Sequence, residues 1–246
     1  MNILITGANR GLGLSLAREA VRRGHKALCC CRKPSEELEA LRREAPRQVW
    51  VYPMDVASTE RVREAAERIR SDFQALDVII NNAAVLLETK YFTGDPVTDL
   101  PLADLENTLN VNVLGPIRVL HELMPLCYQS AGPQVLNITS EGARLKPQGS
   151  HYLGYSISKY ALNMYTQKIR NYFAERRGDK NVRTFMVHPG RMNTVMGVEN
   201  AQIEPEVPAQ GILDIVEGKI QVPEMEIPFI DYLGRPMPDH YDPLNP

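Results

Sequence analysis

Short apolar runs alternate along this chain with longer segments in which charged residues recur at helical spacing. The six clearest runs are largely apolar and do not alternate strictly with polar residues, and they span residues 3–5, 27–31, 49–52, 78–80, 134–138 and 182–187. Continuously apolar runs are typical of parallel strands that helices cover on both faces. A weaker seventh run at 227–230 contains Pro228, which restricts it to the edge of a sheet. The pattern therefore predicts an α/β fold with a parallel sheet and right-handed crossovers.

The charged segments between these runs predict helices on the outside of the sheet. The helix expected from Glu60 to Phe73 carries Arg63/Glu67 and Glu64/Arg68 four residues apart. Such pairs are neighbours on one helical face, so we expect this face to be exposed to solvent.

Composition favours one domain over residues 1–246. The chain has 43% hydrophobic residues and a net charge of −2, from 28 basic and 30 acidic residues. This balance supports neither nucleic-acid binding nor a membrane-surface role. The proline-rich stretch from about residue 202 is expected to form loop and edge structure on the same domain.

The cysteines and the first residues of the sequence indicate the cellular compartment in which the protein is expected. Cys29, Cys30 and Cys31 are consecutive in an apolar run, which is the spacing of neither a disulfide framework nor a metal site. We interpret them as reduced thiols in a buried strand and expect no metal. No apolar run approaches the roughly 20 residues that cross a bilayer, and the first residues are typical of a strand, not a leader. A soluble, cytoplasmic protein is expected.

A glycine-rich turn joins the first predicted strand to the first helix. Gly7, Gly11 and Gly13 follow the spacing G-x3-G-x-G. Glycines allow positive φ angles and let the backbone approach a pyrophosphate, which the following helix N-terminus stabilises. The alternative is a tight turn that binds nothing. Its place at the first strand-to-helix junction favours a dinucleotide site.

The residues after the second strand discriminate between the nicotinamide dinucleotides. An NAD site is expected to offer a carboxylate to the ribose 2′-hydroxyl, whereas this chain has Arg32 and Lys33 and no acidic residue before Glu36. A cation suits a 2′-phosphate, and Arg10 in the glycine turn could add a second. NADP(H) is therefore expected over NAD(H), although Arg32 and Lys33 could also be an ordinary solvated pair.

Further strand ends supply candidate cofactor contacts. Asp55 ends the third strand and could accept from an adenine amino group, or could cap the next helix near Ser58. The sequence from Asn81 to Ala84 leaves room for a flat ring, and Pro189-Gly190 forms a turn whose backbone could face a carboxamide. The predicted cofactor-binding residues are Gly7, Asn9, Arg10, Gly11, Leu12, Gly13, Arg32, Asp55, Val56, Asn81, Ala83, Tyr155, Lys159, Pro189, Met192 and Thr194.

Tyr155 and Lys159 are the candidate proton-transfer pair. They lie four residues apart on a helix expected near residues 152–175, so they share one face. A lysine ammonium roughly 5 Å from a phenolate contributes about 3 kcal/mol at an effective dielectric of about 20. This would lower the tyrosine pKa by about two units and make it useful as an acid or base. An isolated pair with this spacing also occurs by chance on helix surfaces.

Ser140 and Asn112 complete the candidate catalytic group. Ser140 ends the fifth strand, where its hydroxyl could donate to a substrate carbonyl oxygen. Asn112 lies in a long helix expected near residues 104–129, and Pro116 has no N–H for the Asn112 carbonyl. The helix should bend there, and the freed carbonyl could hold a water that extends a proton path through Lys159. The alternatives are a strand-end turn serine and a purely structural proline kink.

These motifs, in this order, resemble the short-chain dehydrogenase/reductase family over essentially the whole chain. The matching features are the turn from Thr6 to Gly13, Asp55, Asn81-Asn82-Ala83-Ala84, Asn112, Ser140, Tyr155/Lys159 and Pro189-Gly190. The resemblance implies a single-domain Rossmann-like fold with a mostly seven-stranded parallel sheet and helices on both faces. It also implies that Tyr155 is the acid/base, Lys159 holds the nicotinamide ribose and lowers the tyrosine pKa, Ser140 polarises the carbonyl, and Asn112 maintains a proton relay.

Finer features are similar to the carbonyl-reductase subgroup, which includes sniffer-type and C-factor-like proteins. They are the sequences from Val111 to Pro116 and from Phe229 to Pro238. The resemblance implies an NADP(H)-dependent oxidoreductase acting on a small carbonyl or alcohol substrate; a cofactor-binding regulatory or signalling protein with little turnover is the alternative. A homodimer or homotetramer, formed through the two long helices, is also expected. Ala84 replaces a usual glycine, and the substrate-lid segment, about 191–206, is short.

Overall fold

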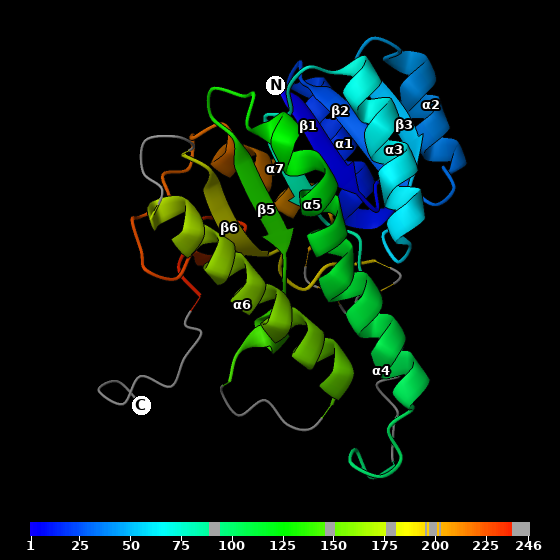
Figure 1. Ribbon diagram of the computed structural model, residues 1–246, viewed down its shortest axis with the longest axis vertical. Helices are drawn as coiled ribbons and strands as arrows, with labels where there is room; N and C mark the ends of the chain where they lie inside the picture. Colours follow the sequence, from blue (N-terminus) through cyan, green and yellow to red (C-terminus); the bar gives the residue numbers. More distant parts are fainter. Residues whose placement is uncertain are drawn as a thin grey trace.

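A seven-stranded parallel sheet forms the centre of the molecule, with the strand order β3-β2-β1-β4-β5-β6-β7 (Figure 1). The computed structural model describes residues 1–88, 94–145, 151–175, 181–194, 196, 201 and 203–237. The predicted α/β fold is confirmed, and each apolar run forms a strand. The strands are β1 (Asn2–Thr6), β2 (Lys26–Cys31), β3 (Val49–Pro53), β4 (Val78–Asn81), β5 (Gln134–Ile138), β6 (Arg183–His188) and, at the edge, β7 (Phe229–Asp231).

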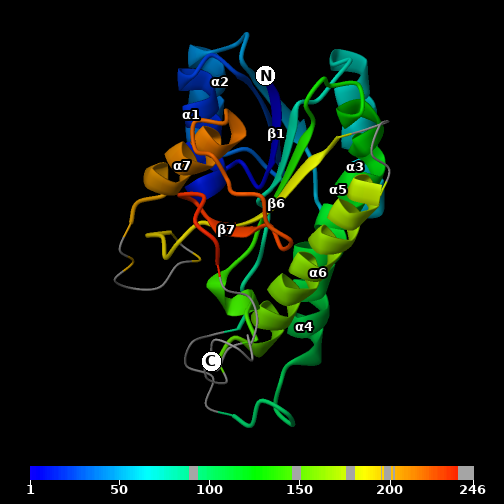
Figure 2. The same ribbon diagram turned by 90° about the vertical axis from the view of Figure 1, so that its left-hand side faces the viewer.

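Helices cover both faces of the sheet (Figure 2). One face carries α1 (Gly11–Arg22), α2 (Glu36–Glu44) and α7 (Glu206–Val216), and the other carries α3 (Thr59–Asp72), α4 (Leu102–Leu109), α5 (Gly115–Cys127) and α6 (Leu153–Glu175). Successive strand residues enter opposite cores, because side chains alternate along a strand. Cys29 and Cys31 therefore pack in one core and Cys30 in the other. All three are free and buried, as predicted.

The strand order creates a switch point between β1 and β4. The chain first builds outward from β1 to β3 and then returns to place β4 on the other side of β1. Open α/β sheets bind ligands at the carboxyl ends of the strands beside such a point. This position determines where the functional residues are expected to gather.

The outer face of α3 is exposed as predicted, but its ion pairs differ from the expected ones. Arg63 contacts Glu60 at 3.5 Å, and Arg61 contacts Glu64 at 2.9 Å, so the pairing follows i,i+3 spacing. Ser58 caps the helix by accepting from the backbone N–H of Arg61.

The long helix near residues 104–129 is interrupted where the sequence predicted a bend. Between α4 and α5, residues Asn110–Leu114 form a π-helical turn, η1. A wide turn accommodates Pro116, which lacks the N–H that an α-helix would require four residues after Asn112. Gly115 follows the turn, and a Cβ there would lie 3.0 Å from Cγ2 of Val56.

The prediction of loop structure from about residue 202 was wrong for Glu206–Val216, which form α7 packed against α1. Pro208 falls in the first turn, where backbone N–H groups have no partner within the helix, so it does not break the helix. Gly211 allows close packing, because a Cβ there would overlap the carbonyl oxygen of Tyr232. The final residues 238–246, and positions 195, 197–200 and 202 of the expected lid, lie outside the described residues.

Candidate active site

The glycine turn between β1 and α1 is shaped by close contacts that exclude larger side chains. Gly7 and Gly11 have φ angles of 67° and 52°, in the left-handed region that favours glycine. A Cβ on Gly13 would overlap the carbonyl oxygen of Gly7, and one on Gly7 would lie 2.9 Å from Cα of Ala83. The turn is thus compressed against the loop that follows β4.

Thr6 and Asn82 join this turn to the loop after β4. The Thr6 hydroxyl oxygen accepts from the backbone N–H groups of Asn82 and Ala83, both at 3.0 Å. The Asn82 side chain donates to the Thr6 carbonyl at 2.9 Å. Ala83 was predicted as a cofactor contact, whereas Thr6 and Asn82 were not. Their signal in the sequence was a hydroxyl and an amide at adjacent strand ends.

The N-terminus of α1 has the properties of an anion site. Arg10 is the residue before the helix, its side chain makes no capping hydrogen bond, and the first turn contains no acidic residue. The first N–H groups and the positive end of the helix dipole therefore suit a phosphate, so the residues present fit a dinucleotide. The Thr194 methyl group lies 3.5 Å from the position of a Cβ on Gly11, which brings the start of the expected lid beside the turn.

The other predicted cofactor residues divide between side chains and backbone. Arg32 is exposed directly after β2. Asp55 accepts from the Ala57 N–H at 3.0 Å and shapes the loop after β3, while Ser58 is the actual helix cap. Leu12 is buried in the hydrophobic core, so only its backbone is available to a cofactor.

The Asn81 side chain is directed into the sheet. It donates to Oδ1 of Asn137 at 2.8 Å, and Asn137 in turn donates to the Thr166 hydroxyl at 2.7 Å. All three residues are buried. The Asn81 side chain therefore points away from the expected cofactor site. A contact between Asn81 and a cofactor would involve the Asn81 backbone.

Tyr155, Ser140 and Lys159 come together at the carboxyl end of β5. The Ser140 hydroxyl lies close enough to the Tyr155 phenol to lower its pKa, and the Ser140 oxygen accepts from the Gly142 N–H at 3.1 Å. The Lys159 ammonium donates to the Ile138 carbonyl at 2.8 Å and lies 5.6 Å from the centre of the Tyr155 ring. Helix α6 thus directs both side chains toward the strand end that carries Ser140, as the i,i+4 spacing predicted.

The pKa values of this pair differ from the expectation. Burial raises the pKa of Tyr155 to about 12, against a smaller lowering by the Ser140 hydrogen bond. Burial also lowers the pKa of Lys159 to about 8, and its side chain is 2% exposed. The predicted acidification of the phenol is not found in this arrangement, because the loss of solvation outweighs the lowering by Ser140.

The Asn112 side chain holds the loop after β4 against α6. Its oxygen accepts from the Val85 N–H at 2.8 Å, and its amide donates to the Val85 carbonyl at 2.9 Å. The same amide donates to the Ser158 hydroxyl at 3.0 Å. Ser158 was not identified from the sequence, and its position beside Lys159 in Tyr155-Ser156-Ile157-Ser158-Lys159 was the only signal.

The turn after β6 approaches the residues that follow Ser140. His188 accepts from the Glu141 N–H at 3.3 Å, and burial lowers the His188 pKa. Arg191 donates to the Glu141 carboxylate at 2.6 Å. Gly190, with a φ of 82°, turns the backbone between them, while Pro189 is buried and Met192 is half-buried beside it.

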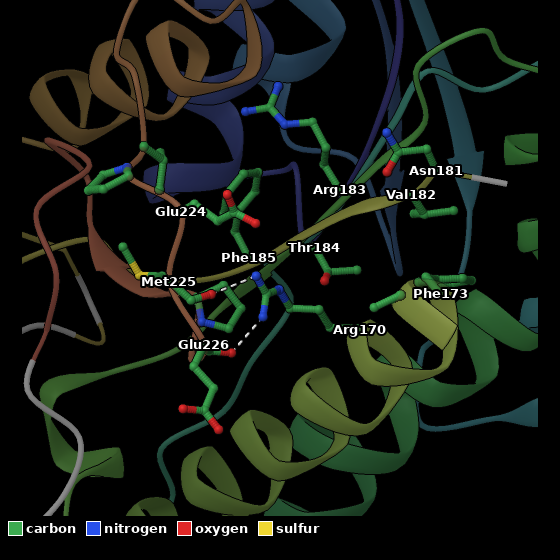
Figure 3. Close-up of a pocket in the computed structure, with 14 residues that line it drawn as sticks. Arg170, Phe173, Asn181, Val182, Arg183, Thr184, Phe185, Glu224, Met225 and Glu226 are labelled. Carbon is green, nitrogen blue, oxygen red and sulfur yellow. Dashed lines mark hydrogen bonds between the residues drawn. The ribbon is translucent and has the colours of Figure 1, made fainter. Parts of the chain in front are cut away.

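A cavity of about 770 Å³ lies in a different part of the molecule, between the end of α6 and the segment before β7 (Figure 3). Phe173 and Phe185 line it, and Arg170 donates to the carbonyl oxygens of Met225 and Glu226 at 2.6 and 2.5 Å. The cavity borders the first half of β6. It is therefore separate from the carboxyl edge where Tyr155 lies.

The short chain dehydrogenase family model matches residues 1–204. Short-chain dehydrogenase/reductase family 9C member 7 from Mus musculus is 30% identical over 203 residues, which cover 80% of this chain and 59% of that protein. Retinol dehydrogenase 5 from Homo sapiens is 32% identical over 197 residues, covering 78% and 57%. The structure is similar to NADPH-bound carbonyl reductase from chicken fatty liver, with a TM-score of 0.82, 22% identity, and coverage of 96% and 98%.

The chain belongs to the short chain dehydrogenase family. Its matched region spans less than two thirds of the length of the two curated relatives. Within the part of the chain that the structure describes, no helix combines the length and the apolar character needed to cross a membrane.

Proposed function

We propose that this chain is an NADP(H)-dependent oxidoreductase that transfers a hydride between the nicotinamide and a small carbonyl or alcohol substrate. The observation that carries the proposal is the meeting of Tyr155, Ser140 and Lys159 at the sheet edge that also bears the glycine turn. A proton donor, an oxyanion donor and an anion site on adjacent strand ends are the parts that carbonyl reduction requires.

Tyr155 would donate the proton in the reductive direction. When bound, the cofactor supplies the hydride to the carbonyl carbon, and negative charge then develops on the carbonyl oxygen. The Ser140 hydroxyl lies close enough to the Tyr155 phenol to lower its pKa, so one carbonyl oxygen could lie within reach of both hydroxyls. With its pKa raised to about 12, the phenol carries its proton at neutral pH, and the negative charge that develops on the carbonyl oxygen would draw this proton across.

Lys159 and Asn112 would support this step without contacting the carbonyl. The Lys159 ammonium can donate to a ribose hydroxyl and attract negative charge on Tyr155. Asn112 holds the Val85 backbone and Ser158, which fixes the loop beside α6. The proposed relay of protons through a water at the Asn112 carbonyl remains part of this hypothesis.

The glycine turn and the loops beside it would hold the dinucleotide. The N–H groups at the start of α1 suit the pyrophosphate, and Asp55, Val56, Ala83 and the Pro189 turn line the same edge. Exposed Arg32 after β2 suits a 2′-phosphate, which supports NADP(H) over NAD(H).

The names of two similar proteins, a retinol dehydrogenase and an NADPH-bound carbonyl reductase, are compatible with the proposed reaction. Together with the motif resemblance, they support a place in the carbonyl-reductase subgroup. A regulatory protein would need the glycine turn but not the Tyr155 group. The same turnover assay therefore separates the two functions.

The first experiment tests proton transfer. A panel of aldehydes, diketones and quinones is screened by the loss of NADPH absorbance, and Tyr155→Phe is compared with Tyr172→Phe, a more exposed tyrosine on the same helix. Tyr155→Phe should lower kcat by at least about 100-fold, within the range for general acid catalysis, while NADPH still binds. Tyr172→Phe should retain full turnover. Unchanged turnover in Tyr155→Phe would rule out the mechanism.

The second experiment tests cofactor choice. Arg32→Asp should raise the Kd of NADPH by about 10- to 100-fold, as expected for loss of a charged hydrogen bond of about 1.5–3 kcal/mol, and change NADH little. Arg47→Asp makes the same charge change before β3, at the other end of the strands, and should affect neither cofactor. Equal losses for both cofactors in Arg32→Asp would show that Arg32 does not bind the 2′-phosphate.

A further inference from the structure

Glu88 contacts the backbone of the candidate catalytic tyrosine itself. One carboxylate oxygen accepts from the Gly154 N–H at 2.8 Å, and the other accepts from the Tyr155 N–H at 2.9 Å. Glu88 lies on the loop after β4, 66 and 67 positions before these residues. The contact is therefore a tertiary one that no helix-capping pattern in the sequence would indicate.

Helix α6 requires such an acceptor at its start. The first N–H groups of a helix have no partner within it, and a carboxylate is favoured there by the helix dipole. Tyr152, just before the helix, is not a capping residue type, and its φ of 58° is unusual for a residue other than glycine. Glu88 supplies from a distant loop the acceptor that the local sequence does not offer.

The same loop is held in place by Asn112. Val85, three positions before Glu88, exchanges two hydrogen bonds with the Asn112 side chain. Asn112 also donates to the Ser158 hydroxyl, which donates to the Tyr155 carbonyl at 2.7 Å. The Tyr155 backbone is thus held at its N–H by Glu88 and at its carbonyl by Ser158, and both supports lead back to Asn112.

We propose that Glu88 is a positioning residue for Tyr155, and that it sets the phenol relative to Ser140 for proton transfer. The inference rests on the proposed function. Its physical basis is that Tyr155 lies in the first turn of α6, where a helix frays unless its N–H groups are held. A displacement of about 1 Å at a reacting group can lower the rate by about 100-fold.

The test compares Glu88→Ala and Glu88→Gln with Ser35→Ala. Glutamine keeps one oxygen acceptor, whereas alanine keeps none. Ser35 caps the remote helix α2 by accepting from the Leu38 N–H at 3.2 Å, so its removal controls for the loss of a cap. The measurements are kcat and KM for the best carbonyl of the panel, the Kd of NADPH, and the ζ-carbon NMR signal of isotope-labelled Tyr155, which Tyr155→Phe identifies.

We expect kcat to fall by about tenfold in Glu88→Ala and by about threefold in Glu88→Gln, with NADPH Kd and substrate KM within about twofold of wild type. The Tyr155 signal should shift in both Glu88 variants and stay unchanged in Ser35→Ala. A kcat in Glu88→Ala equal to that of Ser35→Ala, or an unshifted Tyr155 signal, overturns the proposal. If the wild type reduces no carbonyl, the proposed function fails, and the Tyr155 signal alone still decides whether Glu88 positions this side chain.

Discussion

The buried ammonium of Lys159 should reduce the stability of the folded protein at neutral pH, and Lys159→Met should relieve this cost. Lys159 is 2% exposed, and its ammonium donates to the Ile138 carbonyl at 2.8 Å. Burial lowers its pKa from 10.5 to about 8. Methionine has a similar length and no charge, so it removes the desolvated group with little change in volume.

The magnitude follows from proton linkage. The pKa difference between 10.5 and about 8 corresponds to about 3 kcal/mol, at about 1.4 kcal/mol for each pKa unit. Between these pH values the unfolded chain binds the proton more strongly than the folded protein, so the Lys159 contribution to the free energy of unfolding rises with pH. The cost is complete below pH 8 and disappears near pH 10.5.

Urea unfolding without cofactor, at several pH values from 7 to 10.5, measures the effect. The advantage of Lys159→Met over wild type should shrink by about 3 kcal/mol across this range. Burial also raises the pKa values of Cys29, Cys30, Cys31 and Cys127, but these contributions are common to both proteins and cancel in the difference. A difference that does not change with pH would refute the reasoning.

Two further substitutions test the packing of the fold. Gly13→Ala should destabilise the protein by about 3 kcal/mol in urea unfolding and weaken NADPH binding, because the new Cβ overlaps the Gly7 carbonyl. The control is Gly132→Ala, which should be neutral because nothing lies within 4 Å of its Cβ position. Arg23→Met should cost about 3 kcal/mol at pH 7 by thermal or urea unfolding, because Arg23, 8% exposed, contacts the Glu217 carboxylate at 2.6 Å. Burial alone would raise the Glu217 pKa, but hydrogen bonds from neighbouring cations lower it to about 2, so the loss should shrink below pH 4.5. A loss that is the same at pH 3 and pH 7 would contradict this account.

The strands and the cofactor turn were predictable because their signals are local. A strand covered on both faces needs a continuous apolar run, and every run recognised in the sequence forms a strand of the sheet. The weak seventh run also lies at the sheet edge, where Pro228 confined it. The glycines of the turn are required by backbone contacts within a few residues, such as that between Gly13 and Gly7.

Helix α7 was missed because its local signals point the other way. Pro208 and Gly211 are helix-breaking residues in most settings, but Pro208 falls in the first turn and Gly211 packs against the Tyr232 backbone. Packing on α1 stabilises the helix, and this contribution comes from a segment almost two hundred residues away.

The sequence by itself determined the order of the strands and the set of chemical groups at the sheet edge, because apolar periodicity, glycine positions and residue spacing act over short distances. Only the tertiary structure decided where Asn81 points, which groups support Tyr155, and which way its pKa moves. These properties depend on burial and on partners brought together from different strands and loops. Desolvation and long-range hydrogen bonds therefore have no counterpart in the local pattern of residues.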